Sequence, residues 1–314
     1  MVRRKFNYFR FSIFIAIIVL IIVGIVVLIK NFNYKKSYDY KLLNIGYSES
    51  DVSYIKGKLS NNEIDRLLTY RYNDNIMYFL KEKYFIFNNL DSYLDYKVNN
   101  KNTEYNKVVA IINTESNIDW LDTEKNTDTS KGELMLVNRL YGLSRDYVPS
   151  DLVDVPVKYA YSGSKISKSI LDDIESLIDS AYEDNYKFVV SGGYRSYAEQ
   201  ERLYNAEASR SGKIVADKEV ARPGHSEYQT GLTFDLVPYN KVLENPTLSE
   251  EYLWLKDNAY KYGFIFRLES DKEYITQFKA STWKLRYVGE EAANIINNEK
   301  ICFEEYYAYF IRGN

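Results

Sequence analysis

The feature that most constrains this chain is an apolar run close to its N-terminus. Residues 11–29 (FSIFIAIIVLIIVGIVVLI) contain no charged side chain. At about 1.5 Å per residue, a helix of this length spans roughly 28 Å, which is close to the hydrocarbon thickness of a bilayer. A helix that is apolar on every face does not suit the surface of a soluble core. The sequence therefore predicts a transmembrane helix at residues 11–30.

The flanks of this run indicate its orientation. Basic residues lie on both sides of it: Arg3, Arg4, Lys5, Arg10, Lys30, Lys35 and Lys36. The run is longer than the apolar core of a usual signal peptide, and no small-x-small cleavage pattern follows it. We therefore expect a retained anchor. The charge bias favours a cytoplasmic N-terminus at residues 1–10 and an extracellular C-terminal domain.

The composition of the whole chain narrows the class of protein. Of its 314 residues, 46% are hydrophobic and 27% are charged, which suits one large or two small globular domains. The net charge of -3 provides no broad basic surface, so we expect no nucleic-acid partner. The single cysteine, Cys302, excludes an intrachain disulfide.

Two regions follow the apolar run. Residues 31–131 are predicted to form a linker and a helical N-terminal region, because apolar residues recur there at helical spacing. Within it, the β-branched run VVAIIN at residues 108–113 indicates a strand. Residues 132–314 are predicted to form the main domain, which opens with GELMLVNRLYGLSRDYVPSDLVDV, a strand followed by an extended segment.

The main domain alternates patterns typical of helices and strands. Ser196 with Glu199 three residues later forms a capping-box pattern ahead of a helix. The expected helices cover residues 167–186, 197–210, 250–262 and 290–298, and the expected strands cover residues 187–190, 232–237, 264–267 and 283–289.

Four segments of the main domain resemble motifs of one enzyme family, in the family's order and spacing. They are SGGYRSYAEQERLY, ARPGHSEYQTGLTFDLV, YLWLKDNAYKYGFIFR and STWKLRYVGEEAANII. These segments are similar to the VanY-type D-alanyl-D-alanine carboxypeptidases, which are zinc peptidases that trim the peptide stems of peptidoglycan. The resemblance covers residues 132–314. It implies an α+β fold of the D-Ala-D-Ala carboxypeptidase/Hedgehog type, a central antiparallel sheet with packed helices.

The chemistry of that family requires particular groups. Zinc takes three protein ligands and activates a water molecule at an open fourth position. In the family, a His and an Asp come from the motif S-x-H-x-x-G-x-x-x-D, and a second His ends the motif E-x-W-H. The Glu of that last motif is the general base, and an arginine in the Y-R-S motif faces the substrate.

The resemblance places other residue types at three of these positions. Tyr228 stands at the first histidine, Lys284 at the second, and Ser281 at the general base. Asp235 matches the acidic ligand, and Arg195 matches the substrate arginine. We therefore expect no zinc in this chain, and no catalytic residue is assigned among these degenerate positions.

Two neighbouring residues complete the comparison of motifs. Ser226 matches the serine of the motif and is expected to line the substrate-binding groove with Arg195 and Asp235. His225, the only histidine of the chain, precedes the ligand position by three residues and matches a position that binds no metal in the family. A site with two histidine ligands cannot be built from one histidine.

The replacements have chemical consequences. A tyrosine binds zinc only after losing a proton at a pKa near ~10, and a lysine carries a charge that repels a cation. An oxygen-only metal site would suit calcium or magnesium. We hypothesise that the ammonium of Lys284 replaces the charge of the metal and pairs with Asp235, with Tyr228 hydrogen-bonded nearby. Removing the cation alone would leave a buried, unpaired carboxylate.

The sequence supports three functional interpretations. The first is a membrane-anchored extracellular pseudoenzyme that binds peptidoglycan stem peptides or scaffolds a cell-wall protein. The second is an active D,D-carboxypeptidase, and the third is a structural or interaction ectodomain. Outside the motif positions, Glu227 and Lys272 are predicted to be solvated charges.

Overall fold

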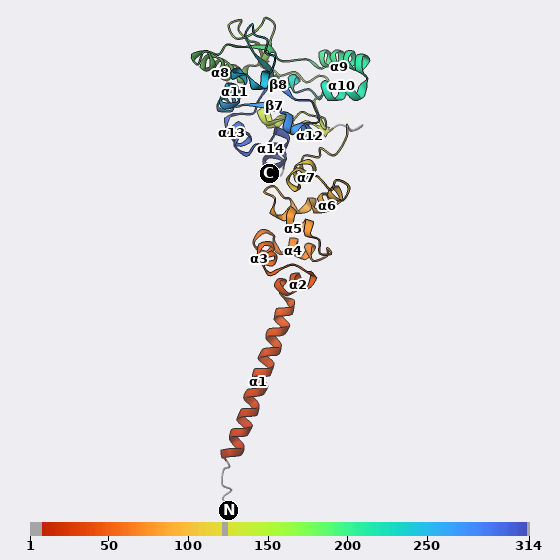
Figure 1. The fold of residues 1–314 in the computed structure, drawn as a ribbon, viewed down its shortest axis with the longest axis vertical. Coiled ribbons are helices and arrows are strands. Elements are labelled where there is room, and N and C mark those ends of the chain that lie inside the picture. Colours follow the sequence, from red (N-terminus) through yellow and green to blue (C-terminus); the bar gives the residue numbers. More distant parts are fainter. Residues whose placement is uncertain (1–7, 121–124, 313–314) are drawn as a thin grey trace, which may run out of the picture. The chain divides into compact units, whose positions relative to one another are not determined.

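The computed structural model describes residues 8–120 and 125–312 (Figure 1). The chain divides into two compact units, Met1–Asn106 and Lys107–Asn314. The sequence places the start of the main domain later, at residue 132. Residues after Lys107 belong to the second unit because Ala110 packs against Ile275 and Cys302 there.

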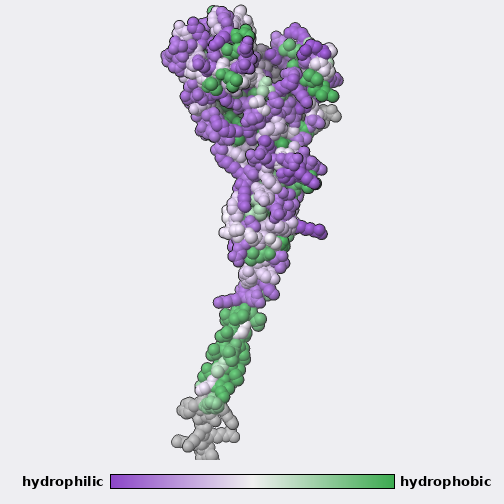
Figure 2. Space-filling view, in the orientation of Figure 1, coloured by the Kyte–Doolittle hydropathy of each residue, from purple (hydrophilic) through white to green (hydrophobic). Residues whose placement is uncertain are grey.

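The first unit begins with the apolar helix α1 (Tyr8–Lys36). In Figure 2 the apolar part of this helix forms a hydrophobic stretch of the surface, and the C-terminal end of the helix is hydrophilic. Its segment Phe11–Lys36 is long and apolar enough to cross a membrane, a test that a signal sequence near the N-terminus also passes. The basic residues Arg3, Arg4 and Lys5 lie outside the described residues.

Five short α-helices and the 3-10 turn Phe87–Asn89 follow α1 in the described part of the first unit. Ser48 and Ser60 cap two of them, each in a capping box that satisfies otherwise unpaired backbone N–H groups. The helices pack around a shared apolar core that includes Leu42, Ile55 and Leu67. They are α2 (Tyr38–Ile45), α3 (Glu49–Lys58), α4 (Asn61–Leu67), α5 (Asp74–Lys81) and α6 (Leu90–Asn99).

Two predicted strands are absent from the described residues at their expected places. The run VVAIIN lies in helix α7 (Tyr105–Asn113), where Val108 through Ile111 are all buried. A short, fully buried apolar run does not distinguish a helix from a strand by its periodicity. The segment 132–137 is irregular and overlaps a 3-10 turn, Thr129–Leu134, in which Gly132 has a φ of 56°.

The second unit is built on a four-stranded sheet whose neighbouring strands are all antiparallel. Its strand order is β5 (Phe188–Gly192), β6 (Thr233–Pro238), β8 (Ser281–Tyr287) and β7 (Phe264–Leu268). Two-stranded pairs join β1 (Lys125–Asn126) with β2 (Tyr141–Gly142), and β3 (Leu152–Asp154) with β4 (Lys165–Ser167). The predicted α+β class with a central antiparallel sheet is confirmed.

Helices cover this sheet and extend from it. Helix α8 buries Ile174, Leu177, Ile178 and Ala181, the face predicted from the sequence. In Figure 1, α9 and α10 lie side by side, away from α8. The helices are α8 (Leu171–Glu183), α9 (Tyr197–Ser211), α10 (Lys213–Glu219), α11 (Glu250–Asn258), α12 (Glu273–Thr276), α13 (Glu290–Glu299) and α14 (Phe303–Tyr306).

The start of α9 is fixed by the predicted capping box. The backbone N–H of Glu199 donates to the Ser196 hydroxyl at 3.3 Å. In return, the backbone N–H of Ser196 donates to the Glu199 carboxylate at 2.8 Å. This cap places the segment that carries Arg195 directly before a rigid helix, and it therefore helps to position that side chain.

Candidate functional site

The sheet brings two of the predicted site residues together. Asp235 on β6 and Lys284 on β8 are direct partners in the antiparallel register. Residues opposite each other in such a pair project to the same face, with Cβ atoms about 4.5–5.5 Å apart. On the other side of β6, Gly192 pairs with Asp235, and a Cβ added there would lie 3.1 Å from the Asp235 Oδ2. A glycine at this position leaves room for the carboxylate.

The third residue of the site comes from a turn before β6. Tyr228 lies in the 3-10 turn Glu227–Thr230, which ends at Gly231 with a φ of 70°. A glycine adopts this left-handed conformation without the steric cost of a Cβ. A Cβ at Gly231 would also meet the backbone N of Ser167 at 3.0 Å. The glycine of the motif therefore holds the turn that aims Tyr228 at the sheet.

Tyr228 is hydrogen-bonded to the acidic residue. Its hydroxyl donates to Asp235, at 2.7 Å from Oδ1 and 2.8 Å from Oδ2. Two cations lie over its ring: the Arg195 guanidinium carbon is 4.4 Å from the ring centroid, and the Lys284 Nζ is 4.8 Å from it. Such contacts are attractive because the face of an aromatic ring is negative. One tyrosine therefore links the carboxylate to both positive groups.

Burial and charge set the protonation of this cluster. Burial, together with the charge and hydrogen bond of Asp235, raises the pKa of Tyr228 well above its ordinary value, and Arg195 opposes this only in part. The phenol is therefore protonated at neutral pH. Burial lowers the pKa of Lys284, while the negative charge of Asp235 acts in the opposite direction.

The direct ion pair expected between Lys284 and Asp235 is not among those formed by the described residues. The Lys284 ammonium lies over the Tyr228 ring instead. The Asp235 oxygens accept from the Tyr228 hydroxyl, so the carboxylate is satisfied without a salt bridge. The hypothesis is therefore corrected in its geometry: lysine and carboxylate are cross-strand neighbours, and each of them contacts Tyr228 instead of forming a salt bridge.

Arg195 is held in place by its own contacts. Its Nη1 donates to the Gln200 Oε1 at 3.0 Å, and the Gln200 Nε2 donates to the carbonyl of Ala221 at 2.7 Å. Its backbone N–H donates to the carbonyl of Tyr228 at 3.1 Å. The arginine is thus anchored to both the helix α9 and the turn that carries Tyr228.

A cavity of about 360 Å³ opens over these residues. All six residues expected from the sequence line it: Arg195, Ser226, Tyr228, Asp235, Ser281 and Lys284. We call this cavity the groove. Its charged lining also includes Lys279 and Glu219, so three cations and two carboxylates leave one net positive charge (3 - 2 = 1). The groove is therefore suited to an anionic group such as a carboxylate.

Comparison with known proteins places this arrangement in a family. The family model described as VanY, D-alanyl-D-alanine carboxypeptidase, matches residues 163–290. The putative carboxypeptidase YodJ of Bacillus subtilis (strain 168) is 36% identical over 221 residues, which cover 67% of this chain and 79% of that protein. The chain belongs to the VanY-type D-alanyl-D-alanine carboxypeptidase family. The resemblance found in the four sequence motifs is thereby confirmed.

Two further comparisons support the membership. A D-alanyl-D-alanine carboxypeptidase of Enterococcus faecalis (strain ATCC 700802 / V583) is 35% identical over 188 residues, 57% of this chain and 67% of that protein. The solved structure of the LdcB LD-carboxypeptidase, described as revealing the molecular basis of peptidoglycan recognition, has a TM-score of 0.56 and 35% identity. The structural match covers 60% of this chain and 92% of the LdcB chain. The VanY-type family acts on peptidoglycan.

The donors at the VanY-type metal positions do not fit a zinc ion. The Tyr228 phenol keeps its proton, since its pKa is raised, and it uses that proton to bond both oxygens of Asp235. Lys284 contributes an amine whose charged form repels a cation. Ser281 carries no carboxylate that could take a proton from water. The site therefore departs from the VanY-type pattern in its chemistry as well as in its residue names.

His225 lies beside the groove in a buried position. Its Nδ1 is 2.7 Å from the carbonyl oxygen of Asn138, and its ring meets Trp120 edge to face at 5.1 Å. Only 4% of the residue is exposed. These contacts give His225 a structural role in packing and hydrogen bonding.

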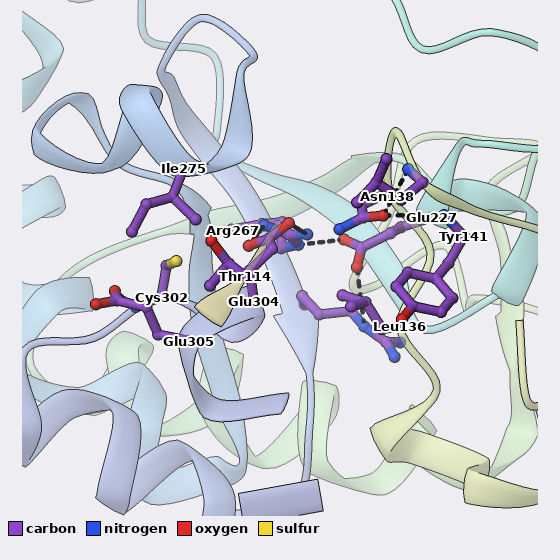
Figure 3. A network of polar contacts seen from close by, with 12 residues as sticks. Thr114, Leu136, Asn138, Tyr141, Glu227, Arg267, Ile275, Cys302, Glu304 and Glu305 are labelled. Carbon is purple, nitrogen blue, oxygen red and sulfur yellow. Dashed lines mark hydrogen bonds and ion pairs between the residues drawn. The ribbon is translucent and has the colours of Figure 1, made fainter. Parts of the chain in front are cut away.

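Sequence reasoning missed a buried ion network next to the groove (Figure 3). Glu227 was predicted to be solvated, yet its Oε2 accepts from the Nε of Arg267 at 2.7 Å, and both side chains are buried. Arg267 also binds Glu304. Lys272, the other predicted solvated charge, pairs with Glu305 at 2.8 Å and is largely buried. Charged residues are usually exposed, so a single sequence gave no signal for this burial.

Proposed function

We propose that this chain is a membrane-anchored, cell-surface member of the VanY-type family that binds peptidoglycan stem peptides in the groove without cleaving them. The observation that carries the proposal is the cluster at Tyr228. Its hydroxyl bonds both oxygens of Asp235, while Arg195 and Lys284 lie over its ring. At the positions that match the catalytic residues of the family, the chain has a cavity of ligand size and positively charged side chains.

The loss of cleavage follows from what the groove lacks. Peptide hydrolysis in this family needs an activated water and a base to take its proton. Tyr228 holds its proton, and Ser281 cannot act as a carboxylate-type base. We therefore expect a stem peptide to remain intact in the groove.

Binding is supported by the chemistry of a stem peptide. Its C-terminal D-alanine carries a carboxylate, which the net positive lining of the groove favours. Arg195 can pair with such a group through two parallel N–H donors, a geometry that fits carboxylates closely. Ser226 and Ser281 also line the groove, and their hydroxyls can bond the peptide backbone.

The N-terminal helix supports a location at the cell surface. α1 is long and apolar enough to span a bilayer, and basic residues precede the run more densely than they follow it. An anchored body outside the membrane would face the cell wall, where the substrate of this family lies.

A binding experiment on the full chain in detergent tests the proposal. We expect a pentapeptide ending in D-Ala-D-Ala to bind, and the same peptide with a C-terminal amide to bind much more weakly. Arg195→Ala should strongly reduce the preference for the carboxylate. Arg210→Ala is the matched control, because Arg210 lies on the same helix α9 and pairs with Glu207 outside the groove.

Zinc content and product release are measured on the same sample. We expect no release of D-alanine by the natural chain. Stoichiometric zinc with release of D-alanine would establish the active carboxypeptidase instead. If neither peptide binds, the chain is a structural or interaction ectodomain.

A rescue variant tests whether only the groove has changed. Tyr228→His, Ser281→Glu and Lys284→His together restore the residue types of the VanY-type motifs. We expect the triple variant to take up one zinc ion, which the natural chain should not. Absence of zinc in a folded triple variant would mean that the surrounding scaffold has changed as well.

A further inference from the structure

A second cavity lies at the other end of strand β5 from the groove. Its volume is about 660 Å³, which is in the usual range for sites that bind small molecules. Phe188 and Val189 at the start of β5 line it, whereas Gly192 at the end of β5 lies against Asp235 in the groove. At about 3.3 Å per residue, roughly 13 Å of strand separates the two sites.

The rim of this cavity carries exposed tyrosine rings. Tyr161 and Tyr239 have ring centroids 6.4 Å apart with planes tilted by 31°, and they are 43% and 49% exposed. Tyr182 on helix α8 is 63% exposed and also lines the cavity. Each of these side chains lines the cavity, and a tyrosine combines an apolar ring with a hydroxyl. Tyrosines gathered in this way offer stacking surfaces that the core of the protein does not use.

One wall of the cavity is a fixed polar cluster. The Tyr159 hydroxyl donates to the Asp179 Oδ2 at 2.8 Å, and the Lys158 Nζ donates to the Tyr159 oxygen at 2.6 Å. Lys158 also pairs with Asp179 at 3.0 Å. Tyr159 itself is buried in the core cluster, so it holds the two charged groups at the edge of the cavity. Their outer faces remain accessible to a ligand, since both side chains are about half exposed or more.

These features together match one class of ligand. A pyranose ring presents a flat face of C–H groups, which stacks on aromatic rings, and a rim of hydroxyls, which need both donors and acceptors. The rings of Tyr161 and Tyr239 offer a stacking surface for the C–H face. The cluster of Lys158, Tyr159 and Asp179 offers donors and acceptors for the hydroxyls. Of the charged residues of the lining, Lys158 and Asp179 pair with each other, and the Lys187 ammonium lies 5.8 Å from the centroid of the Tyr182 ring.

We propose that this cavity binds a saccharide unit of a glycan strand, separately from the peptide groove. The inference goes beyond the proposed function and does not depend on it. It also gives the two sites a common target: about four extended peptide residues span roughly 13 Å. A polymer that carries peptide stems on a sugar backbone can therefore reach both.

The test uses the full chain in a detergent without a sugar headgroup. The probe is a tetramer of N-acetylglucosamine that carries no peptide, titrated by calorimetry. We expect saturable binding that Tyr161→Ala combined with Tyr239→Ala weakens by about tenfold or more. The matched control is Tyr78→Ala, an exposed tyrosine of the first unit, which should leave the affinity unchanged.

A second variant guards against a loss of folding. Asp179→Asn keeps the size of the side chain and removes the charge of the acceptor, and it should weaken saccharide binding severalfold while the thermal unfolding midpoint stays within a few degrees. Arg195→Ala should leave saccharide binding unchanged, which separates this site from the groove. The proposal is overturned if the tetramer does not bind at millimolar concentration, or if it binds equally well to the double tyrosine variant and to the natural chain.

Discussion

Two adjacent residues of one turn, Glu227 and Tyr228, enter charge clusters of opposite character. Glu227 belongs to a buried network with Arg267, Glu304 and Arg286, in which two guanidinium groups face two carboxylates. Tyr228 belongs to the groove, where the lining keeps an excess positive charge and a cavity. A buried cluster whose positive and negative charges balance stabilises the fold. A cluster with a net charge beside a cavity can bind a ligand of opposite charge.

The pKa values of the two arginines in the buried network, Arg267 and Arg286, shift in opposite directions. Burial lowers the pKa of Arg267, but the charges of Glu227 and Glu304 outweigh this and raise it overall. Burial lowers the pKa of Arg286 to about 10, although Glu227 acts against this. Both guanidinium groups therefore remain charged at neutral pH, and the network stays balanced.

The largest expected effect breaks the buried network. Arg267→Met leaves the carboxylates of Glu227 and Glu304 buried without their shared cation. Removing one partner of such a cluster costs about 3–5 kcal/mol of unfolding free energy. Denaturant unfolding of the full chain measures this loss. Arg210→Met, at an exposed ion pair, is the control and should leave the unfolding free energy unchanged. A loss for Arg267→Met no greater than that of the control would contradict the structural role of the network.

A smaller effect is expected from the hydrogen bond inside the groove. Tyr228→Phe keeps the ring under Arg195 and Lys284 but removes the donor to Asp235. Asp235 is only half buried and lines the groove, so losing this donor should cost less than the about 1–3 kcal/mol of a fully buried acceptor. The same unfolding experiment measures it. Combining the change with Asp235→Asn should recover part of the loss, and full additivity of the two losses would show that the residues do not interact.

The third prediction concerns pH and peptide affinity. Burial lowers the pKa of Lys284, so its ammonium is present below that pKa and is lost at a lower pH than for a surface lysine. Because the charged form attracts a carboxylate, peptide affinity should be greatest below the folded-state pKa of Lys284 and fall as the pH rises through it. Titration at several pH values measures it. Lys284→Arg should retain affinity to higher pH, and an identical profile for both chains would exclude Lys284 from carboxylate binding.

The lowered pKa of Lys284 also makes stability depend on pH, in the opposite direction to peptide affinity. The folded state releases the Lys284 proton below pH 10.4, the approximate pKa of an unperturbed lysine, whereas the unfolded state still holds it. Between the two pKa values the unfolded state binds more protons, and the contribution of this residue to stability rises with pH. Lys284→Met should remove that rise in pH-dependent unfolding measurements.

The smallest expected effect lies at the rim of the groove. Lys279 pairs with Glu219, and its side chain is 60% exposed. Exposed ion pairs contribute little to stability and are screened by salt. Lys279→Ala should leave the unfolding midpoint unchanged and reduce peptide affinity slightly at low salt only. A large loss of stability would place Lys279 in the architecture of the groove.

Several features of the chain could be predicted from local sequence. The apolar run is found in helix α1, the apolar face of helix α8 is buried as expected, and Ser196 caps α9. Each depends on residues a few positions apart, so the physical cause is contained in a short segment. The four motifs also predicted the family. They place Asp235 and Lys284 in separate segments, which form the neighbouring strands β6 and β8.

Other features were decided only by the tertiary structure. Residues 108–113 are helical, Glu227 is buried against Arg267, and the Lys284 ammonium lies over Tyr228 instead of pairing with Asp235. In each case the outcome depends on side chains that the fold brings together from separate segments, and on how much water that packing removes. The sequence by itself determined which residue types stand at the positions that match the VanY-type zinc ligands. The packing around Tyr228 decided that their positions became a positively charged groove.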